Sequence, residues 1–199
     1  MSAKRQNRHA QIVDEATRLF SRDGFKKVTI KQLAKACEIT EPALYRHFES
    51  KTKIYEAVLD SLETRLVNKN IFKQFEQVED LDELLLGLAE NILSFYKKNK
   101  DMYRLLLFSA LEGHERAKHV YVLIRGKHVE FLIKRLDRLY ELGLIRKKNN
   151  EITARCFIGM VFDCALGFTL WKGMQGKMYQ PAEVIANNIP IYINGLKKQ

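Results

Sequence analysis

Cysteine is scarce in this 199-residue sequence, which contains only Cys37, Cys156 and Cys164. No two of them form a C-x-x-C pair, and neither they nor the five histidines show the spacing of metal ligands. A disulfide framework and a structural zinc site are therefore excluded as organising features. Free thiols of this kind fit a reducing compartment.

Long apolar runs are also missing. The longest, from Phe157 to Trp171, is interrupted by Asp163 and falls short of the roughly 20 residues that a membrane-spanning helix needs. Residues 1–8 are polar and basic, and no apolar stretch follows them as in a secretory signal. We therefore expect a cytoplasmic protein without a membrane partner.

The sequence lacks the compact motifs that mark common enzymes. It has no HExxH pair of zinc ligands, no glycine-rich phosphate loop and no GxSxG nucleophile turn. A helical enzyme is thus a weak alternative. We expect no catalytic residues, no cofactor and no metal.

Proline is rare: between Pro42 and Pro181 there is none. The same region shows no alternation of polar and apolar residues, so the pattern predicts an all-α fold built from long helices. The breaks between them fall at glycines and at short charged or amide-rich stretches. The predicted helices after residue 50 cover 51–73, 81–98, 101–113, 115–142, 151–172 and 181–197.

What the chain does have is positive charge, concentrated at one end. The net charge is +10, and residues 1–53 hold 12 basic and 6 acidic side chains, which is more than half of the excess. A basic surface attracts phosphate and releases counterions on binding. By itself this distribution fits a solvated basic face equally well.

Two short helices with a tight turn between them are predicted at residues 29–48. Thr29 is a candidate N-cap, and it is followed by apolar residues at the i, i+3, i+4, i+7 spacing of one buried helix face. After Ile39 the chain restarts at Thr40, a second N-cap candidate, and Pro42 fits a first helical turn. The apolar residues of the first helix are Ile30, Leu33, Ala34 and Cys37.

In the second helix, Leu44 and Phe48 lie four residues apart and are predicted to anchor it to the core. The opposite face would then point outward, and a helix held in this way can enter the major groove of DNA. The residues predicted on that face are Thr40, Glu41, Ala43, Arg46 and His47.

The group Leu44-Tyr45-Arg46-His47-Phe48, followed by Lys51 and a long helix, resembles the DNA-binding domain of the tetracycline-repressor-like (TetR) family of bacterial transcription regulators. The resemblance runs from about residue 9 to about residue 62 and includes an amphipathic first helix that stops at Gly24-Phe25. It implies a three-helix helix-turn-helix domain over residues 1–50 and a helical effector-binding and dimerisation domain over residues 51–199. One departure is Glu38, where the family usually has glycine; a non-glycine residue at positive φ costs about 1 kcal/mol.

The outward residues have expected roles in DNA binding. Arg46 is the best candidate for reading a guanine edge, with a phosphate contact as the alternative. The resemblance assigns Tyr45 and His47 to phosphate oxygens, and Thr29 and Lys51 are expected to grip the DNA backbone.

Thr40, Glu41 and Ala43 are also expected to lie near the major groove of the DNA. Ala43 could touch a thymine methyl group, while Glu41 either accepts from cytosine or, as we favour, complements the helix dipole. Residues 4, 5 and 8 form a basic segment for which a minor-groove arm and a solvated tail remain equal alternatives.

The C-terminal part is rich in aromatic and methionine side chains, which line small-molecule cavities but also fill ordinary cores. The family resemblance implies an effector pocket here. Its candidate residues are Phe95, Met102, Tyr103, Leu106, Phe131, Phe157, Phe162 and Trp171.

The helices expected at 151–172 and 181–197 are the most apolar, and the resemblance implies that they pair with their twins in a homodimer. The alternative is that they are the central helices of a monomer. Asp163, alone in the first of these helices, would be costly to bury unpaired. It could orient a ligand, face water or, as we favour, bond across the dimer seam.

These features predict a ligand-responsive transcription regulator, most simply a repressor that binds a palindromic DNA operator as a dimer and is released by a small apolar or amphipathic effector. The alternative is a ligand-blind architectural or division-associated DNA-binding protein of the same fold.

Overall fold

The computed structural model describes residues 3–67, 71–169 and 180–198, and every regular element within these ranges is a helix apart from one isolated bridge between Ile145 and Lys197. The prediction of an all-α protein is confirmed. The chain forms two compact units: residues up to 69 together with 101–123, and residues 70–100 together with 124–199. The predicted domain boundary at residue 50 differs from this grouping by packing and stays a prediction.

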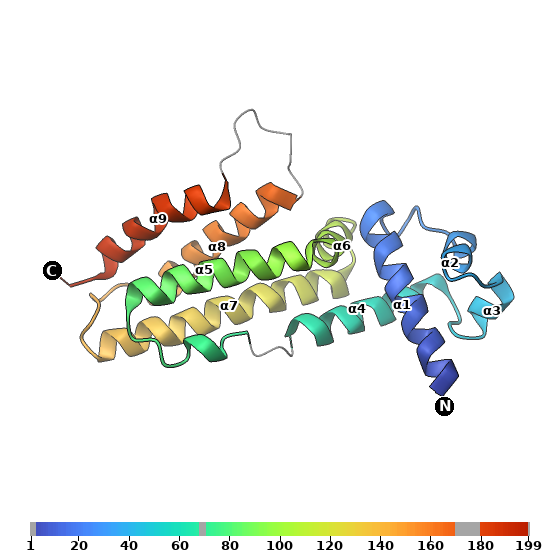
Figure 1. Cartoon of the computed structure of the whole chain (residues 1–199), viewed down its shortest axis with the longest axis horizontal. Coiled ribbons are helices and arrows are strands. Elements are labelled where there is room, and N and C mark those ends of the chain that lie inside the picture. The colour runs from blue at the N-terminus through green and yellow to red at the C-terminus, as the bar shows by residue number, and fades with distance from the viewer. Residues whose placement is uncertain (1–2, 68–70, 170–179, 199) are drawn as a thin grey trace. The chain divides into compact units, whose positions relative to one another are not determined.

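The first unit contains α1 (Ala3–Asp23), α2 (Ile30–Ala36), α3 (Glu41–Tyr45) and α4 (Lys51–Val67), followed by α6 (Lys100–Leu111) and the first part of α7 (Glu115–Glu141). Helix α1 crosses α4 and packs against it (Figure 1). Both helices present buried residues at intervals of three and four. Full burial of such a side chain stabilises the fold by about 1.5–3 kcal/mol. The fully buried residues of this interface include Ile12, Ala16, Phe20, Ile54, Val58 and Leu62.

The turn between α6 and α7 belongs to this first unit. The ring of His114 lies 4.5 Å from that of Tyr55 on α4, and the Arg116 guanidinium donates hydrogen bonds to Asp60 and, at 3.1 Å, to Glu63. Burial raises the pKa of Tyr55 to about 12, opposed by the neighbouring Ser109 hydroxyl. These contacts bind the α6–α7 turn to α4.

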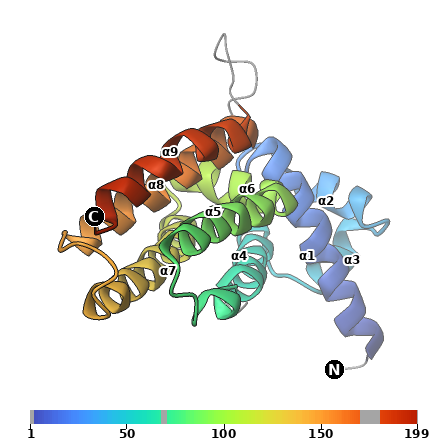
Figure 2. The same ribbon diagram turned by 60° about the vertical axis from the view of Figure 1, so that its left-hand side comes forward.

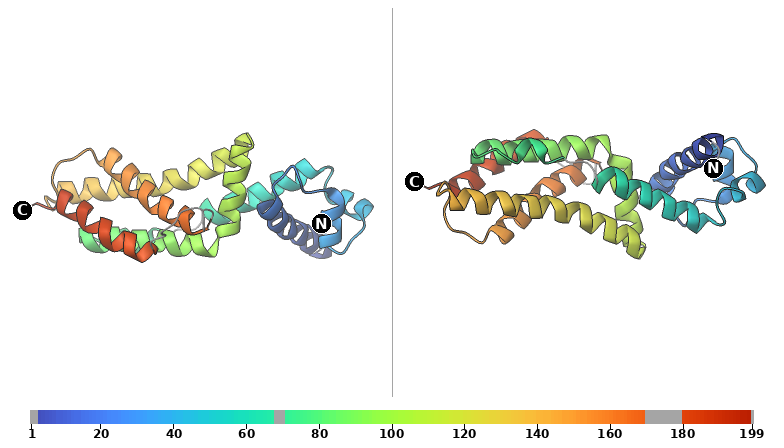
Figure 3. Two further views of the ribbon diagram at one scale, coloured as in Figure 1. Left: turned by 90° about the horizontal axis from the view of Figure 1, so that it is seen from above. Right: turned by 90° about the horizontal axis from the view of Figure 1, so that it is seen from below.

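The second unit contains the 3-10 turn η1 (Lys73–Phe75), α5 (Leu81–Lys98), the rest of α7, α8 (Asn150–Thr169) and α9 (Pro181–Leu196). Helices α8 and α9 run side by side (Figure 2), and both pack against α5, over which α9 lies in the view from above (Figure 3). A Cβ atom at Gly87 of α5 would lie 2.8 Å from the Phe75 ring, so only glycine lets η1 approach α5 this closely. Arg135 of α7 holds the same segment by donating to the carbonyl oxygens of Glu76, at 2.6 Å, and Val78, at 2.5 Å.

Two details of the helix prediction are wrong. The helix predicted over 51–73 does not reach residue 73, because residues 71–72 form a turn and Lys73–Phe75 a 3-10 helix. At the N-terminus, α1 begins at Ala3, so residues 4, 5 and 8 are helical and form no extended arm. Arg8 instead donates to the Gln11 side chain at 2.6 Å and to the Cys37 carbonyl oxygen at 3.4 Å.

Candidate nucleic-acid interface

Helix α2 begins at a complete capping box. The Thr29 hydroxyl accepts from the backbone N–H of Gln32 at 3.2 Å, and the Gln32 side chain accepts from the Thr29 backbone N–H at 2.8 Å. This arrangement satisfies two of the orphan donors at the helix start and typically contributes about 1 kcal/mol. The hydroxyl of Thr29 therefore has a local structural role, whatever its contact with DNA.

The turn that follows α2 has the strained geometry predicted for it. Glu38 has a φ of +54° and is the one non-glycine residue with positive φ in the described ranges. Its N–H donates to the Lys35 carbonyl, and the N–H of Ile39 donates to that of Ala34 at 3.0 Å, the hydrogen-bond pattern of a Schellman motif. Glu38 thus adopts the left-handed backbone conformation that glycine usually adopts at this position.

Helix α3 is short and is held in place by side chains that pack into the core. Thr40 caps it by accepting from the Ala43 N–H at 3.3 Å, and Pro42 lies in its first turn as predicted. Leu44 is fully buried and Phe48, 7% exposed, stacks on His9 of α1 with ring centroids 4.4 Å apart. These two residues hold the helix against the core, which leaves its other face to solvent.

That free face carries the residues singled out in the sequence. Thr40, Glu41 and Arg46 are exposed, and Ala43 and His47 are partly exposed. Tyr45 is 50% exposed, a large value for an aromatic side chain on a helix that is otherwise anchored by Leu44. A polar and aromatic surface on a short, rigidly held helix fits the dimensions of the major groove.

Lys51 has a structural role that its sequence position did not reveal. Its ammonium donates to the backbone carbonyls of Phe25 and Val28 at 2.9 and 3.0 Å and lies 4.4 Å from the centre of the Phe25 ring. At most one of its three N–H groups remains for a phosphate oxygen. Lys51 therefore fastens the start of α4 to the loop before α2.

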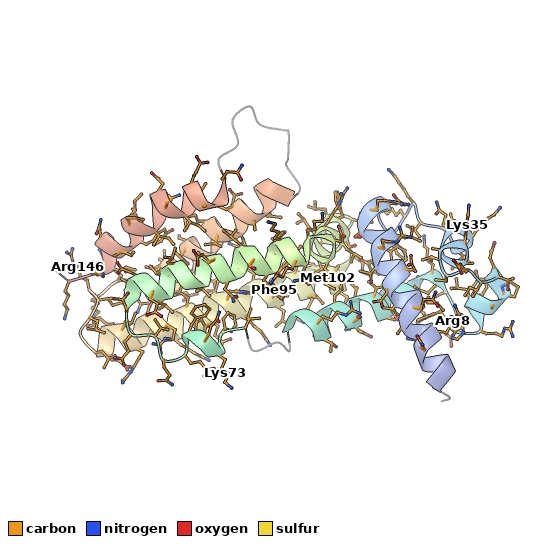
Figure 4. The ribbon with its side chains drawn as sticks, viewed as in Figure 1. Arg8, Lys35, Lys73, Phe95, Met102 and Arg146 are labelled. Atoms are coloured by element: carbon orange, nitrogen blue, oxygen red, sulfur yellow. The ribbon has the colours of Figure 1, made fainter. Side chains whose placement is uncertain are left out.

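Sequence reasoning missed a second set of cations on this unit. Lys26, Lys31 and Lys35 are exposed, and none of them forms an ion pair with another described residue; Figure 4 labels Lys35 on α2. Their only signal in the sequence was the excess of basic residues before position 53. Lysines without ion-pair partners can neutralise phosphates without selecting a base sequence.

The candidate pocket residues are divided between the units. Met102, Tyr103 and Leu106 of α6 belong to the first unit, and Phe95, Phe131, Phe157 and Phe162 to the second; Figure 4 labels Phe95 on α5. Phe157 is fully buried, and its ring packs against Tyr192 of α9, so it is part of the contact between α8 and α9. Trp171 lies outside the described residues.

The predicted dimer helices expose apolar side chains. Ile152 on α8 is 59% exposed and Ile191 on α9 is 63% exposed; they border an open groove of ≈ 330 Å³ that Cys156 and Tyr192 also line. Asp163 is exposed on α8.

Among the described residues, no three His, Cys, Asp or Glu side chains lie close enough together to hold a metal ion. None of the described helices is long and apolar enough to span a bilayer.

Comparison with known proteins agrees with this geometry. Residues 12–58 match the model of the family described as bacterial regulatory proteins, tetR family. Over its full length the chain shares the fold of a transcriptional regulator from Saccharomonospora viridis whose crystal structure contains choline, with a TM-score of 0.75, 16% identity and coverage of 98% of this chain and 100% of that one.

The curated relatives include nucleoid occlusion factors and an HTH-type transcriptional regulator. The chain is 29% identical over 144 residues to the nucleoid occlusion factor SlmA of Marinomonas sp., covering 71% of this chain and 72% of that protein. Several other SlmA proteins align over only 44% to 57% of their own length. The HTH-type transcriptional regulator YdgC of Bacillus subtilis is 22% identical, covering 96% of this chain and 95% of that one.

The family match falls on the helices that build the exposed α3 surface, and the full-length fold likeness extends over both units. Residues 12–58 therefore carry a DNA-binding segment of the tetR type, and the chain as a whole has the fold of the transcriptional regulators to which it is similar.

Proposed function

We propose that the protein is a ligand-responsive repressor that binds a palindromic operator as a homodimer. The observation that carries this proposal is the exposed face of α3, with Tyr45 and Arg46 turned to solvent above the buried Leu44. Two such helices related by a twofold axis would enter successive major grooves about 34 Å apart. We infer that the protein works in the cytoplasm, at the nucleoid.

The exposed apolar face of α8 and α9 supports the dimer. Ile152 and Ile191 are among the most exposed large apolar residues of the chain, and both lie at one groove. Contiguous exposed apolar patches often mark the surfaces through which proteins associate. A second copy seated on the same face would bury them symmetrically.

The response to a ligand is supported by the way helices are shared between the units. Helix α7 starts in the first unit, where Arg116 binds α4, and continues into the second. A small apolar or amphipathic ligand that prefers one arrangement of α7 would change the preferred position of α4, the helix that follows the DNA-reading helices. Operator affinity would then fall by the difference in ligand affinity between the two states.

Fluorescence anisotropy tests the central claim. The labelled duplex carries the palindrome nearest to the protein's own gene, and the control is a scrambled duplex of the same composition at moderate salt. We expect at least a hundredfold preference for the palindrome. Equal affinity for the two duplexes would reject operator-specific regulation.

The similarity to SlmA supports one rival: a ligand-blind nucleoid-associated DNA binder. The two functions differ in their response to small molecules. Thermal shift against a metabolite and drug library, followed by anisotropy with each hit, separates them: stabilisation together with loss of operator binding favours the repressor, and no stabilisation by any compound favours the rival.

A further inference from the structure

A histidine ring nitrogen is one of several buried polar atoms in the described part of the second unit that form no hydrogen bond there. His128 on α7 is 2% exposed, and its Nδ1 lies 2.8 Å from the carbonyl oxygen of Ile124 one turn earlier. The other ring nitrogen, Nε2, is buried and forms no hydrogen bond within the described structure. Leaving a buried polar atom unpaired destabilises the folded state, so an atom of this kind needs a specific explanation.

The tautomer of His128 follows from its one hydrogen bond. A carbonyl oxygen can only accept, so Nδ1 must carry the proton and donate it to Ile124. In the neutral ring Nε2 is then a pure acceptor. Burial lowers the pKa of His128, which keeps the ring neutral, while the Ile124 carbonyl opposes that shift.

Aromatic rings from three segments surround the imidazole. Phe72, just before η1, and Phe162 of α8 meet it edge-on, with ring centroids 5.0 and 5.5 Å away, and Phe131 of α7 stacks on Phe72 at 4.5 Å. Phe162 is almost fully buried, whereas Phe72 and Phe131 are partly exposed. The cluster therefore reaches the surface at the Phe72–Phe131 pair.

We propose that Nε2 of His128 is the polar anchor of the effector site, and that the effector is an apolar, ring-containing compound with a hydroxyl or N–H group that donates to it. The proposal rests on the proposed ligand response and specifies its chemistry. The phenylalanine rings would cover the apolar body of the ligand, and its donor would pair with Nε2 of His128. An anionic ligand group would instead require a charged imidazole, which burial disfavours.

The test uses pairs of compounds that differ only in the donor: indole against 1-methylindole, and 2-naphthol against 2-methoxynaphthalene. Full-length ¹⁵N-labelled protein is titrated with each, and the ring ¹⁵N resonances of His128 are followed by NMR without DNA. We expect the donor compounds to shift Nε2 and to bind about tenfold more tightly than their methylated partners.

Two variants make the result specific to the ring nitrogen. His128→Phe keeps a ring of similar shape but has no acceptor, and it should bind both members of a pair equally. His128→Gln places an amide oxygen near the position of Nε2 and should recover part of the preference. Circular dichroism and thermal unfolding confirm that both variants fold.

Three outcomes would overturn the proposal: no donor compound shifts Nε2 up to its solubility limit, the methylated compounds bind as tightly as the donors, or His128→Phe retains the preference. Because these measurements contain no DNA, they are independent of operator binding. If the donor compounds bind selectively at His128 but do not release the protein from operator DNA, the proposed ligand response is refuted. The binding site at His128 would still be supported.

Discussion

The Lys51 ammonium donates a hydrogen bond to the carbonyl oxygen of Val28 at 3.0 Å and thereby joins the start of α4 to the residue before the cap of α2. The same ammonium holds the carbonyl of Phe25. The orientation of α2, and of α3 beyond it, therefore depends on a side chain that enters from the opposite end of the DNA-reading segment.

Replacing Lys51 with methionine should destabilise the protein by about 1–3 kcal/mol, because two partly buried carbonyls lose a charged donor while the aliphatic stem remains. Urea unfolding measures the change. The matched control is Lys53→Met, which removes only an exposed pair with Glu56 and should change stability by less than about 0.5 kcal/mol. If Lys51→Met leaves stability intact and lowers only the salt dependence of DNA binding, Lys51 is a phosphate contact instead.

Glu38→Gly should stabilise the protein by up to about 1 kcal/mol, because glycine adopts the φ of +54° at this turn without a steric penalty. For a chain of this size, that corresponds to a rise in Tm of about 2–4 °C in calorimetry. Glu49→Gly is the control, since Glu49 does not have a positive φ and glycine there adds only unfolded-state entropy. An unchanged or lower Tm for Glu38→Gly would mean that the glutamate side chain contributes more than the backbone strain costs.

Arg46→Ala should relax sequence preference at one base pair by about 1–3 kcal/mol if the guanidinium reads a guanine edge. Lys35→Ala should instead weaken binding to all sequences alike and reduce the salt slope by about one unit. Anisotropy with a set of single-base operator variants at several salt concentrations distinguishes the two patterns. Uniform weakening by Arg46→Ala would assign that residue to a phosphate.

Ile191→Asp should shift the protein from dimer to monomer, because it places a charge on the exposed apolar face of α9. Val122→Asp, a change at an equally apolar position that is 59% exposed in the first unit, should leave the assembly unchanged. Sedimentation velocity at micromolar concentration reports both. A dimer that survives Ile191→Asp would place the interface elsewhere.

Acid should destabilise the protein through His128. Because burial lowers its pKa in the folded state, the unfolded chain binds more protons just below the ordinary histidine value of about 6.5. The free energy of unfolding should therefore be constant above that pH and fall below it, by up to about 1.4 kcal/mol per pH unit. Urea titrations at several pH values should show this slope reduced in His128→Gln and retained in His119→Gln, which changes an exposed residue.

The parts of the fold that depend on neighbours in sequence could be predicted. The caps at Thr29 and Thr40 and the anchors Leu44 and Phe48 follow from local spacing, and the structure confirms each of them. The strain at Glu38 was expected from the family resemblance, and the structure gives this residue a positive φ.

The contacts that depend on distant segments could not. The carbonyl partners of Lys51 lie 23 and 26 residues away, and no periodicity indicates that an ammonium will meet main-chain oxygens. The assignment of α6 to the first unit, and the isolation of His128 Nε2 among aromatic rings, likewise depend on which helix faces meet. The DNA-binding roles of the α3 residues and the identity of the dimer helices remain predictions.

The close packing of the Phe75 ring on Gly87 means that the residue types at these two positions cannot change independently. Alanine usually strengthens a helix interior, but here its methyl group would need the space that the ring occupies. We therefore expect paired substitution during divergence: descendants with a larger residue at position 87 should carry a smaller one at position 75, and either change alone should be selected against.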